Sequence, residues 1–466
     1  MTAAPRTGRA HAARPALIPI AWPLFSELLL GISVGLVGLA LASRASEAAS
    51  GAFALANSIQ ATFFLLLRVI SLGVSVTITQ ELGAGNREMA DATARASLGA
   101  STWVGLATAV GVAASARPLL GMLGAPADVL PLAAPYLEVL AIALGLDAYN
   151  ASMAAVMRAH LRPRDVLGII LSMHALHLLL CWPLMRGAGV LPGLGLPGYA
   201  VAMLVSRAFG IGCHLYLWRR RLGLVPTLRD WWRLRRQRLA PVLHIGLPGA
   251  AEGLAYRLAL MFTVAAVARM GTAALATQAY AMQVTYFTVL PGLSIGLATE
   301  ILVGRLIGAG QLGEARRRAR RSLGWGLVVS IGVALVAAVT ARQSLTLFTH
   351  DPAILATAQT LLWITVLLEP GRTFNLVVIN ALRATGDARF PVAAGVLSMI
   401  VVMAGGAWLL GVHLGLGLPG VWIAYAADEW LRGLVMAGRW QRGAWAPHAR
   451  AAFRRVRQGR RPTIPG

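Results

Sequence analysis

Long apolar runs follow one another along almost the whole chain, and they constrain its fold more than any other feature. Of the 466 residues, 57% are hydrophobic and 13% are charged. A helix of about 20 apolar residues crosses the hydrocarbon core of a bilayer with its backbone hydrogen bonds satisfied internally. The runs therefore predict an all-α polytopic membrane protein. Twelve spans are predicted, at 17–42, 52–79, 96–116, 129–157, 166–185, 198–218, 243–268, 275–303, 322–341, 354–382, 391–411 and 419–438.

The second half of the chain repeats the first at a fixed distance along the sequence, the repeat spacing, which separates Pro23 from Pro248. The same spacing relates Gly83 to Gly308, Asn150 to Asn375, and Arg158 to Arg383. An L-G-L-P-G motif occurs once in each half, beginning at Leu194 and at Leu416, and the distance between its two occurrences is slightly shorter than the repeat spacing. Each copy holds six spans, an even number, so both copies enter the membrane in the same orientation. This predicts two parallel six-helix lobes related by a pseudo-two-fold axis along the membrane normal, as in transporters that bind substrate between lobes.

The positive charge of the chain indicates its orientation in the membrane. The net charge is +24, and all 42 basic residues are arginines, which cluster in some connections between spans and avoid others. Arginine-rich connections are typically cytoplasmic, so we expect a multi-pass inner-membrane protein with both termini in the cytoplasm and no nucleic-acid partner. The expected divisions are an N-terminal tail (1–16), an N-lobe (17–218), a cytoplasmic linker (219–240), a C-lobe (241–438) and a basic C-terminal tail (439–466).

Two acidic residues occupy equivalent positions inside the apolar runs. Glu252 follows Pro248 in I-G-L-P-G-A-A-E, and Glu27 follows Pro23 in A-W-P-L-F-S-E. An ionisable group within a membrane span is costly and usually functional. Because burial favours the neutral form of a carboxylic acid, such a group can take up and release a proton. We predict that Glu252, and second Glu27, carries a coupling cation, and that Tyr256 hydrogen-bonds Glu252. A satisfied structural acid is the alternative for each.

Further charged residues fall inside the spans. Glu300 is a third candidate for the coupling cation. Asp428 and Arg432 are spaced i,i+4 with the acid first, which favours a structural ion pair within the last span. Asp147 and Arg372 correspond at the repeat spacing, which suggests an ion pair between the two lobes.

Aromatic and sulfur-containing side chains gather in the eighth span and just before it. Such side chains can form an adaptable pocket for flat cationic compounds through apolar and cation–π contacts, although lipid-facing or core positions are the alternative. The predicted substrate-binding residues are Tyr256, Tyr280, Met282, Tyr286 and Phe287. Cys181 and Cys213 are isolated, so we expect no disulfide and no metal site. No G-K-[ST] phosphate-binding motif follows the glycine pairs, which favours an ion gradient over ATP as the energy source.

Two stretches of the second half carry recognisable motifs. They are L-R-A-T-G-D-A-R-F-P from Leu382 to Pro391 and V-L-P-G-L-S-I-G-L-A-T-E-I-L-V-G-R-L-I-G-A-G from Val289 to Gly310. The first is similar to L-R-G-x-G-D-x-x-x-P, with Ala384 in place of the glycine, and the second to P-G-x-G-x-x-x-A-x-x-x-x-V-G-x-x-x-G-A-G, both motifs of the multidrug and toxic compound extrusion (MATE) family of transporters, which the sequence therefore resembles. Two motifs differ. Gly38 stands where many members carry an aspartate in the first span, and Ala276-Thr277-Gln278-Ala279 lacks the histidine of A-A-H-Q.

The resemblance implies a secondary antiporter, not an enzyme, that exports drugs or metabolites in exchange for protons or sodium ions. It implies alternating access of two lobes, with small-molecule substrates and the lipid bilayer as the partners and with no cofactor apart from H+ or Na+. We expect a monomer. The alternative is a lipid-linked saccharide flippase of the same superfamily, for which the buried arginines Arg68, Arg257 and Arg372 would line a basic cavity.

Overall fold

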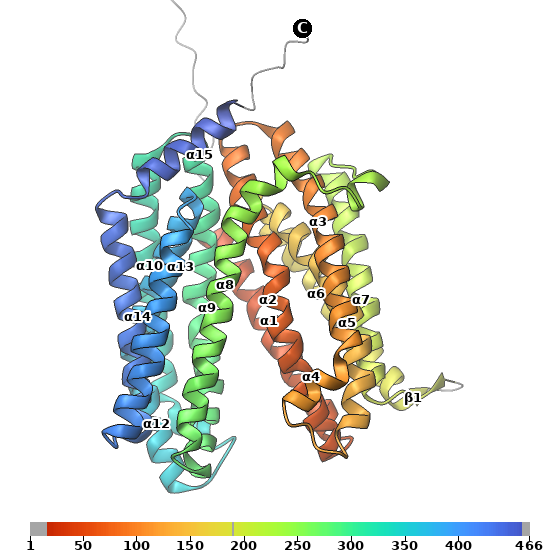
Figure 1. Cartoon of the computed structure of the whole chain (residues 1–466), viewed down its shortest axis with the longest axis vertical. Helices are drawn as coiled ribbons and strands as arrows, with labels where there is room; N and C mark the ends of the chain where they lie inside the picture. Colours follow the sequence, from red (N-terminus) through yellow and green to blue (C-terminus); the bar gives the residue numbers. More distant parts are fainter. Residues whose placement is uncertain (1–15, 189–190, 459–466) are drawn as a thin grey trace, which may run out of the picture.

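The computed structural model describes residues 16–188 and 191–458. Within them, twelve long helices form two lobes (Figure 1). The N-lobe holds α1 (Ile18–Ser43), α2 (Glu47–Gly83), α3 (Arg87–Ala114), α5 (Leu130–Ala159), α6 (Pro163–Arg186) and α7 (Leu196–Leu217). The C-lobe holds α8 (Arg236–Ala268), α9 (Thr272–Gly308), α10 (Leu312–Val339), α12 (Pro352–Thr385), α13 (Arg389–Ser398) and α14 (Gly417–Gln441). The π-helical segments η3 (Met399–Gly405) and η4 (Ala407–His413) continue α13, so that the three together form one long helix.

These helices confirm the all-α polytopic fold with twelve spans. Eleven of them are long and apolar enough to cross a membrane by length and composition. The twelfth, α14, has 25 residues but carries Asp428, Glu429 and Arg432 in its middle, and these charges lower its apolar character. The remaining elements are short: α4 (Ala116–Met122), α11 (Ala341–Leu345), η1 (Trp218–Leu222), η2 (Leu228–Trp231), α15 (Ala446–Gln458) and the paired strands β1 (Gly187–Ala188) and β2 (Leu191–Pro192).

Parts of the predicted tails lie outside the described residues. These are residues 1–15, which include Arg6, Arg9 and Arg14, and residues 459–466. The described part of the basic C-terminal tail contains the last residues of α14 and all of α15, and the predicted linker contains η2.

The helix boundaries recur at the repeat spacing of the sequence. α9 begins and ends one repeat spacing after α2, and α10 begins and ends one repeat spacing after α3. α2 and α9 pack against each other. A Cβ atom added at Gly83 would clash with the backbone oxygen of Arg305, and one added at Gly308 would clash with that of Gln80. Glycine thus lets the two backbones touch, as small residues do between membrane helices.

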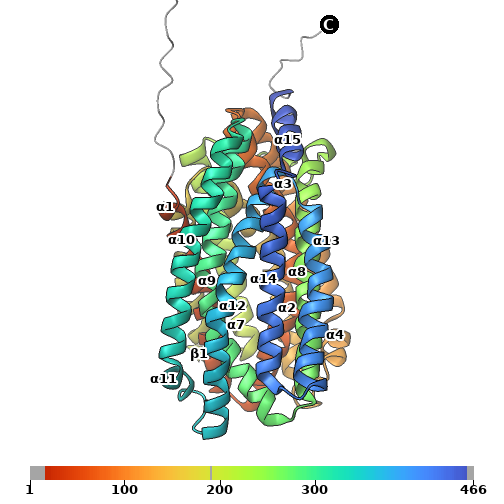
Figure 2. The same cartoon turned by 90° about the vertical axis from the view of Figure 1, so that its left-hand side faces the viewer.

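Helix α15 marks one end of the molecule. α1 begins at the same end as α15 (Figure 2). The helices of the two lobes lie close together there and diverge toward the opposite end (Figure 1). α15 reaches the N-lobe: Nη2 of Arg455 donates a hydrogen bond to Oε1 of Gln80 at 2.8 Å, and Nδ2 of Asn86 donates to the backbone oxygen of Val456 at 3.4 Å.

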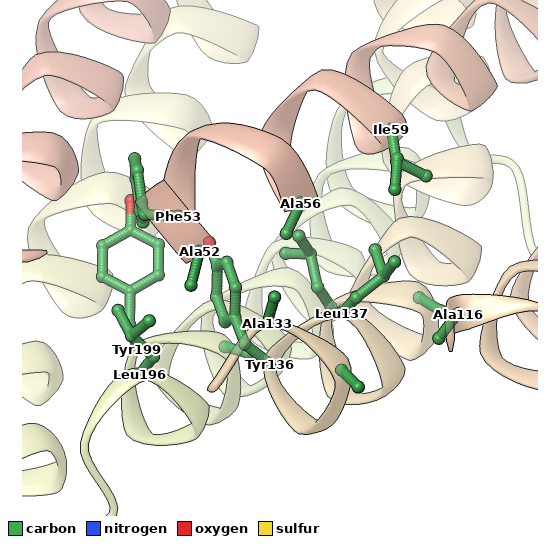
Figure 3. Packing of buried hydrophobic residues seen from close by; sticks show 14 of the residues in the cluster. Ala52, Phe53, Ala56, Ile59, Ala116, Ala133, Tyr136, Leu137, Leu196 and Tyr199 are labelled. Atoms are coloured by element: carbon green, nitrogen blue, oxygen red, sulfur yellow. The ribbon is translucent and has the colours of Figure 1, made fainter. Parts of the chain in front are cut away.

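Aromatic rings and small residues together pack the N-lobe core. Phe53 of α2 stacks on Tyr136 of α5 with ring centroids 5.8 Å apart, and the ring of Tyr199 from α7 meets Phe53 edge-on at 5.2 Å. Buried Ala52 and Ala56 leave room for these rings (Figure 3). Edge-on and offset contacts suit the charge distribution of aromatic rings. Phe53 and Tyr199 also form part of the wall of a cavity.

Candidate functional site

The N-lobe encloses a cavity of about 600 Å³ between α1, α2, α5, α6 and α7. Its wall combines apolar and aromatic residues with a small set of charged and polar side chains. The charged and polar residues that line it are Glu27, Asn57, Gln60, Asp147, Asn150, Arg158, His174, Arg207 and His214. A mostly apolar cavity of this size with a few convergent polar groups is typical of a small-molecule site.

An ion pair between α1 and α5 lies at this cavity. Nη1 of Arg158 is 2.8 Å from Oε2 of Glu27, whose side chain is 8% exposed. The other carboxylate oxygen of Glu27, Oε1, has no hydrogen-bond partner among the described residues. Glu27 therefore has one oxygen held by an arginine and one that can accept a proton or a cation.

A second cavity, of about 310 Å³, lies between the lobes, where α2 faces α8, α9, α12 and α14. An ion pair between α8 and α12 lies at this cavity too: Nη2 of Arg383 donates to Oε2 of Glu252. Glu252 is 8% exposed. The charged and polar residues that line the cavity are Arg68, Glu252, Tyr256, Thr285, Tyr286, Arg372, Asn375, Asn380, Arg383, Glu429 and Arg432.

The two ion pairs are equivalent in the two lobes. Glu252 lies one repeat spacing after Glu27, and Arg383 lies one repeat spacing after Arg158, so the same acid and the same base meet in each copy. Sequence reasoning singled out the acids and missed the arginines as their partners. The signal was present, because Arg158 and Arg383 match at the spacing that relates the two acids.

A further pair of equivalent contacts has opposite polarity in the two lobes. In the N-lobe, Nε of Arg207 is 2.8 Å from Oδ1 of Asp147. In the C-lobe the corresponding positions hold Arg372 and Glu429, with Nε and Oε1 3.4 Å apart. The interlobe pair suggested for Asp147 and Arg372 is therefore wrong, because each residue finds an opposite charge within its own lobe.

Arg372 and Arg432 share a cluster of three acids inside the C-lobe. Nη1 of Arg372 is 2.6 Å from Oε1 of Glu369, and Nη2 of Arg432 is 3.0 Å from Oε1 of Glu429. Asp428 and Arg432, the pair expected from their spacing, lie 2.6 Å apart between Oδ2 and Nη2. All five side chains are nearly buried. Close opposite charges offset the cost of removing each from water.

Glu300 lies where the two lobes meet. Oγ of Ser75 on α2 donates a hydrogen bond to Oε1 of Glu300 on α9 at 2.8 Å. Glu300 is 2% exposed, and its second carboxylate oxygen, Oε2, has no partner among the described residues. It does not line either of the two cavities.

The predicted substrate-binding residues lie in three different environments. Tyr256, Met282 and Tyr286 line the interlobe cavity. Tyr280 stacks on Phe348 with ring centroids 5.6 Å apart, and Phe287 is 39% exposed outside the cavity. The carboxylate of Glu252 pairs with Arg383, not with Tyr256 as we expected. Within residues 16–188 and 191–458, no group of three or more His, Cys, Asp or Glu side chains could hold a metal ion.

Two equivalent hydrogen bonds close the lobes together at the end that carries α15. Nε2 of Gln80 on α2 donates to the backbone oxygen of Ala384 on α12 at 2.8 Å, and Nη2 of Arg305 on α9 donates to that of Ala159 on α5 at 2.7 Å. Gln80 and Arg305 correspond at the repeat spacing, as do Ala159 and Ala384. Each lobe thus contributes one donor and one acceptor to this interlobe seal.

Comparison with known proteins agrees with this architecture. The MatE family model matches residues 23–183 and again 248–409, one match for each repeat. The uncharacterized transporter YisQ of Bacillus subtilis is 33% identical over 92% of this chain and 94% of its own length, and the probable multidrug resistance protein NorM of Deinococcus radiodurans is 30% identical over 91% and 94%. The solved structure of a MOP superfamily transporter from Pyrococcus furiosus has the same fold, with a TM-score of 0.85 at 20% identity over 93% of this chain and 96% of that chain. The chain therefore belongs to the MatE family.

Proposed function

We propose that this chain is a secondary antiporter of the inner membrane, which exports drugs or other organic cations in exchange for protons or sodium ions. The family membership and the similarity to NorM of Deinococcus radiodurans support export of organic compounds. The observation that carries the proposal is the repeated acid–arginine pair, Glu27 with Arg158 and Glu252 with Arg383, at the wall of a cavity in each case.

Each of these pairs can link cation binding to helix movement. Glu252 and Arg383 lie on different helices, and so do Glu27 and Arg158. A proton or sodium ion that binds the carboxylate neutralises it and removes its attraction for the arginine. Separating the two partners of a buried ion pair is costly. A carboxylate without a bound cation would therefore oppose movement of the two helices that carry the pair, and a bound cation would permit that movement. This provides the coupling that alternating access of two lobes requires.

The N-lobe cavity suits an organic cation. Its volume of about 600 Å³ falls in the range of drug-binding pockets. Phe53 and Tyr199 present aromatic surface to it. Oε1 of Glu27 supplies a carboxylate oxygen with no hydrogen-bond partner among the described residues. Aromatic faces attract cations, and acids nearby strengthen that attraction. Coupling cation and substrate would compete for the carboxylate of Glu27, so that binding of one favours release of the other.

The orientation follows from the arginine-rich connections. With these connections and α15 in the cytoplasm, the seal formed by Gln80 and Arg305 closes the molecule toward the cytoplasm. The described conformation would then be the one that releases substrate outward.

Transport in proteoliposomes tests the proposal. The full chain would be reconstituted, a proton or a sodium gradient imposed separately, and uptake of a fluorescent organic cation followed. We expect one gradient to drive transport, and Glu252→Gln to abolish driven transport without loss of protein from the membrane. Glu47→Gln, at an exposed residue, is the matched control. Driven transport by Glu252→Gln at the unmodified rate would overturn the assignment, and the same test with Glu27→Gln distinguishes one cation site from two.

The flippase alternative requires a basic cavity, and the structure offers little free positive charge for one. Nη2 of Arg257 donates to the backbone oxygen of Ser58 at 2.9 Å, and Arg372 is held by Glu369 and Glu429. Of the three arginines that favoured this alternative, Arg68 alone lines the interlobe cavity without a hydrogen-bonded partner in the described part of the chain. We therefore favour the antiporter.

A further inference from the structure

A third cavity, of about 410 Å³, lies away from the transport cavities, at the end of the C-lobe that carries α15. It is a groove between α10, α12 and α14. Three arginines of α10, Arg316, Arg317 and Arg320, line one side, Phe374 and Trp440 line the other, and none of its lining residues is acidic. The arginines lie in the first turns of α10, and apolar residues follow from Leu323 onward. The groove therefore sits where a membrane span meets the headgroup layer.

In the N-lobe the equivalent groove is filled by protein. α3, α5 and α7 form it, and the linker element η2 lies against α3. Trp231 of η2 packs on Tyr149, the counterpart of Phe374, with ring centroids 5.2 Å apart. Nε1 of Trp103 donates to the backbone oxygen of Trp232 at 3.0 Å. The linker between the lobes thus covers this face of the N-lobe.

Two equivalent glycines show the difference directly. A Cβ atom added at Gly99 of α3 would lie 2.5 Å from the backbone oxygen of Arg233 in the linker. One added at Gly324 of α10, its counterpart, would have no heavy atom within 4 Å. Among the described residues, the linker covers this helix face in the N-lobe, and no segment covers its counterpart at Gly324 in the C-lobe.

The uncovered groove also carries far more positive charge. The counterparts of Arg316, Arg317 and Arg320 in α3 are Asp91, Ala92 and Arg95. The charges of these three N-lobe residues sum to zero, whereas all three C-lobe residues are positively charged. Nη2 of Arg316 donates to the backbone oxygen of Gln441 at 2.9 Å, and Arg317 pairs with Glu314. Arg320 has no hydrogen-bond or ion-pair partner within residues 16–188 and 191–458, and all three arginines are exposed.

We propose that this groove binds an anionic phospholipid of the leaflet on the α15 side, which in the proposed orientation is the cytoplasmic one. The arginines would hold the phosphate through charge-assisted hydrogen bonds, and an acyl chain would lie against Leu323 and Phe374 in place of the linker that covers the N-lobe. Basic pockets between membrane helices on the cytoplasmic side bind anionic headgroups in this way.

Native mass spectrometry of the full chain, released from nanodiscs, tests the site. The nanodiscs would contain phosphatidylglycerol or phosphatidylcholine with identical acyl chains. We expect the chain to retain phosphatidylglycerol and to lose it in Arg316→Gln/Arg317→Gln/Arg320→Gln. One arginine near an anionic surface contributes about five-fold in binding, so the triple variant should bind about 100-fold more weakly.

A matched variant controls for general electrostatic attraction. Arg219→Gln/Arg220→Gln/Arg221→Gln removes the same charge from exposed arginines of η1 and should retain phosphatidylglycerol. Equal retention by both triple variants and the unmodified chain would overturn the proposal. So would equal retention of phosphatidylcholine. Displacement of the lipid by millimolar inorganic phosphate would assign the groove to a free anion and also overturn it. The assay is independent of transport, so its outcome does not depend on the proposed antiport.

Discussion

Ser75 and Glu300 occupy the same position in the two halves of the chain and touch each other. The repeat spacing separates them along the sequence, and Oγ of Ser75 lies 2.8 Å from Oε1 of Glu300. Two equivalent residues of a symmetric pair can meet only at the symmetry axis, so the pseudo-two-fold axis passes between them. The contact is nevertheless asymmetric, because one copy has a hydroxyl there and the other a carboxylate. A single acid thus lies at the centre of a duplicated fold.

Neutralising Glu300 should leave the fold intact and change its response to cations. Glu300→Gln keeps an acceptor for Ser75 and removes a buried charge with an unsatisfied oxygen, so we expect no loss of thermal stability. If Glu300 holds a cation, sodium or acidic pH should stabilise the unmodified chain and no longer stabilise the variant. Thermal unfolding in detergent, with and without sodium at two pH values, measures this. Ser75→Ala, which loses one hydrogen bond at a cost of ~1 kcal/mol, is the control that should keep the cation response.

Reversing the polarity of the Asp147–Arg207 pair should be tolerated only when both residues change. Asp147→Arg alone places two arginines together in a buried site, and we expect it to cost about 3 to 5 kcal/mol. Asp147→Arg with Arg207→Glu reproduces the arrangement of Arg372 and Glu429 in the C-lobe, so it should recover most of that loss. Thermal unfolding of the purified variants measures both. A double variant no more stable than the single one would show that the two lobes are not interchangeable at this pair.

The close contact between α2 and α9 should not tolerate a larger side chain in place of Gly308. Gly308→Leu drives a side chain into the backbone of Gln80, which we expect to cost about 3 kcal/mol or to prevent assembly of the lobes. Gly332→Leu is the matched control, because a Cβ atom there has no heavy atom within 4 Å. Fluorescence-detected size-exclusion chromatography of both variants checks the prediction. A monodisperse Gly308→Leu peak as stable as the control would contradict the close approach.

The interlobe seal should keep the two lobes close together at the end with α15. Gln80→Ala with Arg305→Ala removes both equivalent donors. We expect the variant to populate a conformation in which the lobes are further apart at this end. Spin labels at Arg164→Cys and Arg389→Cys, two exposed equivalent positions, report the distance by electron–electron double resonance after Cys181 and Cys213 are replaced by serine.

Removal of α15 tests the same seal independently. Truncation after Gly443 deletes the contacts of Arg455 and Val456 with the N-lobe. The distance between the two labels should shift in the same direction as in the double variant, and a smaller shift is expected because Gln80 and Arg305 remain. An unchanged distance distribution in both variants would show that other contacts hold this end closed.

Much of the architecture could be predicted from the sequence because it depends on local or periodic properties. Run length gives the number of spans, and the repeat spacing gives the two copies and their equivalence, from Pro23 and Pro248 to Gly83 and Gly308. The prominence of Glu27 and Glu252 follows from the same reasoning, because a carboxylate within a long apolar run stands out without any knowledge of its neighbours.

The partners of these acids were decided by tertiary structure. Whether Glu252 meets Tyr256 one turn away or Arg383 on another helix depends on how α8 and α12 pack, which no local pattern specifies. The same holds for Asp147, whose equivalent in the other lobe carries the opposite charge and which pairs with Arg207 instead. The linker covers one lobe and leaves an arginine-lined groove on the other, although the two lobes share their sequence pattern. The sequence by itself determined the spans, the repeat and the buried acids, because length and polarity act residue by residue. Only the packing of helices far apart in the chain decided which charges meet, because an ion pair requires two side chains to lie within a few ångströms of each other.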